Sequence, residues 1–153
     1  MCNRLAVACF GGAILAAALP LSAAQAPLNG LEIVVANGPL AGTYTPPATE
    51  VICLYAKKQH RYSAAWKDFS PKGAKAIAEV GINVSNPDDT GAKQGDVRVA
   101  FGDGAGKPVV YSADAVPLTM TARGKGVDIT FDGKTRDGVA LRIKASCQDV
   151  EQL

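Results

Sequence analysis

Residues 139–147, VALRIKASC, have an apolar side chain at every second position, and the positions between them hold Ala140, Arg142, Lys144 and Ser146. Side chains of a β-strand point to opposite faces in turn, so this stretch predicts a half-buried strand with Arg142 and Lys144 facing solvent. A helix would instead repeat its apolar residues every three or four positions. Cys147 has the parity of the apolar residues, which directs its thiol toward a core.

The same period of two recurs through most of the chain and outweighs any helical period. Glycine-rich or Asp-Gly turns separate the alternating runs, as in short hairpins. Further strands are therefore expected near 31–35, 96–101, 108–113, 117–123 and 127–132.

Two stretches depart from simple alternation. Residues 50–56 are apolar at both parities, which predicts a central strand with both faces covered. Residues 74–84 alternate, but Ser70 and Pro71 before them are typical of a helix start. We expect a short helical turn near 71–76 that leads into a strand ending near Asn83.

Many short strands with regular turns predict an all-β fold, a two-layer antiparallel β-sandwich of about seven to nine strands over residues 30–148. The spacing from Cys53 to Trp66 resembles that of an immunoglobulin domain. Cys147, however, falls on the expected final strand, so the likeness is one of architecture only and indicates no family.

The N-terminal residues 1–24 are expected to be a cleaved signal peptide. Arg4 precedes an uncharged apolar run over 5–21, followed by small residues suited to signal peptidase. Cleavage after Ala24 avoids placing Pro27 directly after the cut bond. The mature domain would span 25–153, exported to the periplasm or the extracellular medium.

The charge balance excludes broad classes of partner. Arg4 is the only charged residue of the leader, so the mature chain keeps 15 of the 16 basic side chains and all 14 acidic ones. A net charge near +1 does not favour nucleic acid or an anionic membrane surface. Residues after the leader contain no apolar run long enough for a membrane span.

Two cysteines, Cys53 and Cys147, remain after cleavage. An even number in an exported chain predicts a disulfide, here with one pairing. Since both lie on expected core-facing positions, the bond should be buried, with Cα atoms about 5.5 Å apart.

The stretch 55–67, YAKKQHRYSAAWK, interleaves cations with aromatic rings. It could bind an anionic or glycan ligand, because rings stack on sugars and cations pair with phosphate or carboxylate. Alternatively it is a solvated loop with Tyr55 and Trp66 packed inward. We expect the basic side chains to be exposed and Trp66 at least half buried. The candidate ligand-binding residues are Lys57, Lys58, His60, Arg61, Tyr62 and Trp66.

No catalytic arrangement is evident. His60 is the single histidine, and no serine of the mature chain has the surroundings of a hydrolase nucleophile. With both mature cysteines paired, a zinc or copper site lacks ligands, so we expect neither metal nor cofactor. The sequence favours a non-catalytic binding or envelope-associated protein; an enzyme of unknown class is the least favoured alternative.

Overall fold

A computed structural model describes residues 29–73, 75–102, 107–148 and 150–153 of the chain. The expected leader, residues 1–24, and its cleavage point lie outside the described residues. No helix in the described part of the chain is long and apolar enough to cross a membrane.

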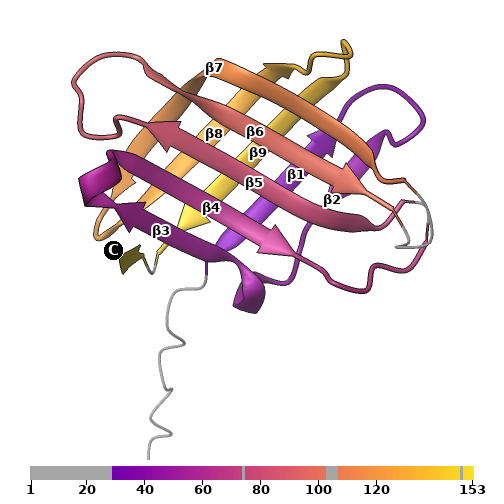
Figure 1. Cartoon of the computed structure of the whole chain (residues 1–153), viewed down its shortest axis with the longest axis horizontal. Coiled ribbons are helices and arrows are strands. Elements are labelled where there is room, and N and C mark those ends of the chain that lie inside the picture. Colours follow the sequence, from indigo (N-terminus) through magenta and orange to yellow (C-terminus); the bar gives the residue numbers. More distant parts are fainter. Residues whose placement is uncertain (1–28, 74, 103–106, 149) are drawn as a thin grey trace, which may run out of the picture.

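Ten strands form one sheet in the order β10-β3-β4-β5-β6-β7-β8-β9-β1-β2 (Figure 1). All neighbouring strands are antiparallel except β10 and β3, which run parallel. The strands are β1 Gly30–Val35, β2 Gly42–Tyr44, β3 Ile52–Ala56, β4 Arg61–Lys67, β5 Ile77–Ser85, β6 Lys93–Phe101, β7 Val109–Arg123, β8 Gly126–Lys134, β9 Ala140–Cys147 and β10 Glu151–Gln152. The all-β prediction is confirmed.

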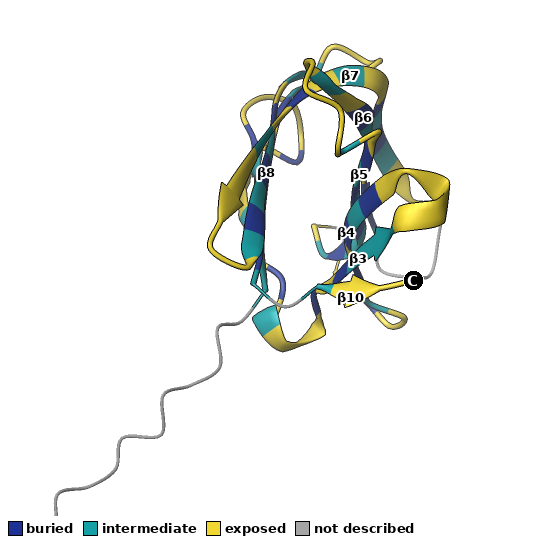
Figure 2. Cartoon of the chain, turned by 90° about the vertical axis from the view of Figure 1, so that its left-hand side faces the viewer, coloured by how far each residue is buried: buried dark blue, intermediate teal, exposed yellow. Residues whose placement is uncertain are grey.

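The sheet curls into a half-barrel, and β7 lies at the bend. Its first part, up to Leu118, pairs with β6, while Thr119 and the residues after it pair with β8. The register of β6 against β7 shifts near Gly95, and Ala115 adopts a positive φ of 50°. This bulge lets one strand belong to both halves of the sheet, which face each other in Figure 2.

The strand count and the course of β7 correct the sequence expectation. The runs 108–113 and 117–123 are one bent strand and not two, and the sheet has ten strands, above the expected seven to nine. The sheet is also continuous from edge to edge, so it does not divide clearly into two separate layers. Alternation reveals which residues face inward, but it carries no information on how far a sheet curls.

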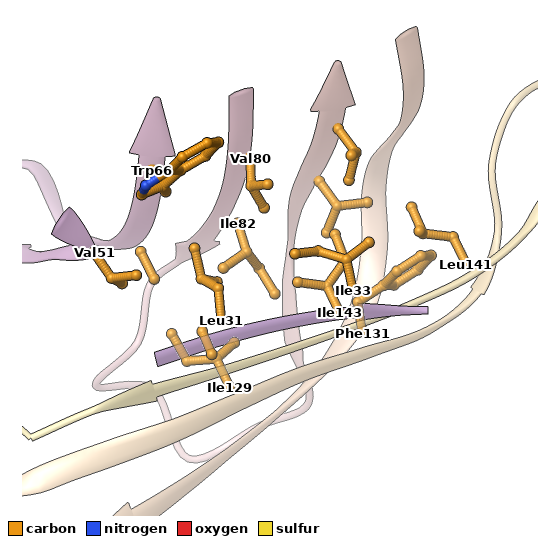
Figure 3. Close-up of a cluster of buried hydrophobic side chains, with 14 of the residues drawn as sticks. Leu31, Ile33, Val51, Trp66, Val80, Ile82, Ile129, Phe131, Leu141 and Ile143 are labelled. Atoms are coloured by element: carbon orange, nitrogen blue, oxygen red, sulfur yellow. The ribbon is translucent and has the colours of Figure 1, made fainter. Parts of the chain in front are cut away.

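Inward-facing side chains from both halves fill the space between them. In β9 the alternation holds as predicted, with Leu141, Ile143, Ala145 and Cys147 buried and Arg142 and Lys144 exposed. Figure 3 shows Val80 and Ile82 of β5 opposite Ile129 and Phe131 of β8. Full burial of such a side chain contributes roughly 1.5–3 kcal/mol, so this core supplies the main stabilisation of the fold.

The predicted disulfide is confirmed. Cys53 on β3 bonds to Cys147 on β9 with a Cα–Cα distance of 5.9 Å, and both residues are buried. The Asn29 side chain makes a second connection, donating to the Val51 carbonyl and accepting from the Gln148 amide. The disulfide therefore joins the two halves of the curled sheet near its open side.

Two local expectations were wrong. The described residues among 71–76 belong to no helix, although the Ala76 amide donates to the Gly73 carbonyl at 2.9 Å. Short 3₁₀ helices lie instead at Ala48–Glu50 and Lys57–Gln59. The stretch 50–56 is near an edge and not central, because only the two-residue β10 lies beyond β3, and Ile52 is 55% exposed.

Candidate functional site

The stretch 55–67 forms the hairpin between β3 and β4 together with all of β4. Residues Lys57–Gln59 make a 3₁₀ turn, and His60 closes it in the left-handed conformation, with φ 48°. Lys57, Lys58, His60 and Arg61 are exposed, as predicted. We call residues 57–61 the basic hairpin.

The structure does not bring the six candidate residues together. Along β4 the side chains alternate, so Tyr62, Ala64 and Trp66 point inward, away from the basic hairpin. Trp66 is 8% exposed and its Nε1–H donates to Glu50 Oε2 at 3.0 Å. Its burial agrees with the expectation, and its role is packing at the far end of β4.

An acidic turn adjoins the basic hairpin. The Asn86 amide donates to the His60 carbonyl at 2.8 Å, which holds the β5–β6 turn against the hairpin. Asp88 in that turn accepts a hydrogen bond from the Tyr55 hydroxyl, and this bond raises the pKa of Tyr55 above its usual value. The carboxylates of Asp88 and Asp89 therefore offset part of the positive charge nearby.

A small cavity lies beside these turns, where the β3–β4, β5–β6 and β7–β8 connections and the C-terminal segment meet. Its volume is about 180 Å³. Pro87, Asp88, Lys125, Gly126 and Gln152 contribute to its lining, and its aromatic and larger apolar side chains are Tyr55, Tyr62, Met120, Val127 and Val150. We call this cavity the Tyr pocket.

Tyr62 is the most distinctive residue of the Tyr pocket. Its ring stacks on that of Tyr55, with centroids 6.1 Å apart and planes inclined by 27°. Its hydroxyl is buried and has no hydrogen-bond partner among the residues that the structure describes. Burial raises the pKa of Tyr62 to about 12, so the hydroxyl keeps its proton at neutral pH.

A second cavity, of about 480 Å³, lies at the other end of β4 between the loop after β2 and the start of β5. Its main lining side chains are already engaged within the protein. Trp66 bonds to Glu50, and the Tyr44 hydroxyl donates to the Leu40 carbonyl at 2.8 Å. The two aromatic polar groups of this cavity, the Trp66 indole and the Tyr44 hydroxyl, therefore already have partners within the protein.

Two further features of the described part concern its metal-ligating side chains and the position of its histidine. No group of three or more His, Cys, Asp or Glu side chains that could hold a metal ion occurs there. His60 lies in the exposed basic hairpin and does not line the Tyr pocket. In the glycine-rich turn 102–106, expected between the strands near 96–101 and 108–113, residues 103–106 lie outside the described residues.

No protein-family model, curated protein or solved structure matches the chain. The site must therefore be interpreted from its own residues.

Sequence reasoning found only one wall of the Tyr pocket. Tyr55 and Tyr62 belong to the stretch that the sequence singled out, whereas Met120, Val127 and Val150 come from distant segments. Curling of the sheet brings these segments together, and no spacing along the chain signals that contact. The inward parity of Tyr62 on β4 was the one available signal.

Proposed function

We propose that this chain is an exported, non-catalytic binding protein whose ligand occupies the Tyr pocket. One observation carries the proposal: the pocket is walled by aromatic and apolar side chains, and its Tyr62 hydroxyl lacks a partner within the described residues. Buried polar groups are almost always hydrogen-bonded. A ligand that supplies the missing hydrogen-bond partner would account for the buried Tyr62 hydroxyl.

The fold supports a binding role because it provides a rigid scaffold. We propose that the two facing halves of the curled sheet act as the two layers of a β-sandwich, with the disulfide fixing their spacing. Turns that connect strands on such a rigid scaffold are common places for binding residues. The pocket lies among three of these turns, so its walls are positioned by the sheet.

Export is supported by the apolar leader and by the buried disulfide. Disulfides persist in the periplasm and outside the cell and are rare in the cytosol. We expect the full chain, expressed in a bacterium, to be recovered from the periplasm or medium with Gln25 first, as determined by intact-mass analysis. Recovery in the cytosol with Met1 retained would contradict export.

A second candidate is binding of an anion or a glycan by the basic hairpin. Exposure of four cationic or potentially cationic side chains, Lys57, Lys58, His60 and Arg61, favours it. Trp66 is turned away from these side chains, and Asp88 lies close by and offsets part of their charge. In this case Lys58→Ala plus Arg61→Ala should weaken phosphate binding and flatten its salt dependence.

A binding screen tests the Tyr pocket. Phenol, cyclohexanol, glucose and phosphate are titrated separately into the ¹⁵N-labelled protein, and amide shifts are followed. We expect at least one compound to shift signals of residues that line the pocket. Val150→Phe, which adds bulk to the lining, should abolish these shifts. The matched control, Val109→Phe, alters a half-exposed valine outside the pocket and should leave them intact.

The proposal fails if none of the four compounds shifts signals of the lining residues. It also fails if such shifts persist unchanged in Val150→Phe. Shifts confined to residues 57–61 and driven by phosphate would instead support the basic hairpin as the binding site.

A further inference from the structure

The size of the Tyr pocket limits what it can enclose. Its volume is about 180 Å³. An engineered apolar cavity of about 150 Å³ in another protein binds benzene, whereas sites for drug-sized ligands span roughly 300–1,000 Å³. The pocket therefore matches a single six-membered ring with a small substituent. A disaccharide or a nucleotide would extend into solvent.

The walls favour a flat apolar ring over a sugar. Tyr55 and Tyr62 supply a stacked aromatic pair, and Met120 and Val127 come from the strands on either side of the β7–β8 turn. Aromatic rings pack well against one another with centroids 4.5–7 Å apart, and the thioether of methionine contacts ring edges favourably. Asp88, Lys125 and Gln152 supply the polar part of the lining. A sugar, with hydroxyls around its whole ring, would still leave those that face the aromatic and apolar walls without partners.

The Tyr62 hydroxyl defines the polar part of the ligand. Tyr62 is 5% exposed, and its hydroxyl finds no acceptor in the described part of the chain. A buried polar group without a partner destabilises the folded protein. Since the hydroxyl holds its proton at neutral pH, the complementary atom on a ligand is a hydrogen-bond acceptor.

We propose that the Tyr pocket binds a single-ring aromatic compound whose substituent carries a hydrogen-bond acceptor, and that this acceptor bonds to the Tyr62 hydroxyl. The proposal rests on the binding function above and names its ligand class. In the complex the ring lies against Tyr55 and Met120, and the substituent points inward. Tyr62 is then the residue that selects for the acceptor.

Two probes of similar shape isolate the acceptor. Acetophenone and ethylbenzene share the ring and the two-carbon substituent, and only acetophenone carries a carbonyl oxygen. Their dissociation constants are measured for the wild type and for Tyr62→Phe by titration into the ¹⁵N-labelled protein, with the amide shifts as the signal. Since a net hydrogen bond contributes about 0.5–1.5 kcal/mol, Tyr62→Phe should weaken acetophenone binding about two- to tenfold. Ethylbenzene binding should change by less than about twofold.

For each probe, the dissociation constant of Tyr62→Phe is compared with that of the wild type. The two probes are not compared directly with each other, because they differ in their own hydration. Tyr111→Phe is the matched control: Tyr111 is equally buried, lies toward the other end of β7 and does not line the pocket. It should leave both dissociation constants unchanged. The backbone spectrum of each variant shows whether the fold is retained.

The possible results separate the two proposals. If both probes bind in the pocket but respond alike to Tyr62→Phe, the inference about the acceptor is overturned and the binding function stands. If neither probe binds, or if Val150→Phe fails to block them, the inference falls, and a negative result in the four-compound screen removes the binding function as well. Selective weakening of acetophenone supports both.

Discussion

Tyr62 and Trp66 lie four residues apart on β4, and both rings point into the core. Each brings one polar atom into an apolar environment. The Trp66 Nε1–H donates to Glu50, whereas the Tyr62 hydroxyl has no acceptor within the residues described. The two ends of β4 therefore differ. At the Trp66 end a carboxylate of the protein supplies the hydrogen-bond partner, whereas at the Tyr62 end a ligand can supply it.

The first way to test this contrast is to remove the Trp66 side chain. Trp66→Ala leaves a cavity in the core, and we expect the free energy of unfolding to fall by about 3–5 kcal/mol. Urea unfolding followed by circular dichroism measures it. A loss below about 1 kcal/mol would show that the Trp66 end is not structural.

Loss of the disulfide should lower the free energy of unfolding nearly as much as Trp66→Ala does. It should also disturb the Trp66 end of β4. Replacing Cys53 and Cys147 with alanine should lower stability by about 2–5 kcal/mol and leave the fold recognisable. Because Glu50 lies three residues before Cys53, the variant should also loosen the contact with Trp66. Fluorescence of the single tryptophan should then shift to longer wavelength. Two titratable thiols in the native protein would contradict the bond itself.

Two variants of Glu50 separate the contribution of the hydrogen bond from that of packing at the Trp66 end of β4. Glu50→Ala leaves the indole N–H without its protein acceptor, so we expect a loss of about 1–2 kcal/mol in urea unfolding. Glu50→Gln keeps an acceptor oxygen and should lose less than half as much. Equal losses in the two variants would mean that the carboxylate charge, and not the hydrogen bond, stabilises this end.

The Tyr62 end should respond to alkaline pH. Burial raises the pKa of Tyr62 to about 12 in the folded protein, against 10.0 for a tyrosine in the unfolded chain. Because the folded pKa is raised, the stabilisation by neutral Tyr62 is complete below pH 10 and is lost as the pH rises from about 10 to 12. Stability measured across this range should fall less in Tyr62→Phe than in the wild type. Parallel curves would contradict burial of the hydroxyl.

The strand pattern could be predicted from local alternation, and the disulfide from the two cysteines that follow the leader. In β9 the parity of Cys147 sufficed to place its thiol in the core. The edge position of β3 could not be predicted, because Ile52 is apolar yet exposed and an apolar run looks central in sequence. The bend in β7 depends on a positive φ at Ala115, a residue that gives no turn signal.

The candidate site was predictable only in part for the same reason. Tyr62 stood in the stretch that the sequence favoured, but alternation along β4 separates it from the basic residues with which it was grouped. Met120 and Val150 reach it only through the curl of the sheet. A site assembled by long-range curvature leaves no spacing in the sequence to recognise.

The free energy of unfolding of Tyr62→Phe tests the central claim most directly, since this variant removes a single oxygen atom. If the hydroxyl has no partner in the unliganded protein, its loss should leave stability within about 0.5 kcal/mol of the wild type or raise it by about 1 kcal/mol. Urea unfolding of both proteins at neutral pH, without added ligand, provides the comparison. A loss of more than about 1 kcal/mol would show that the hydroxyl already has a structural role, and the contrast with Trp66 would be wrong.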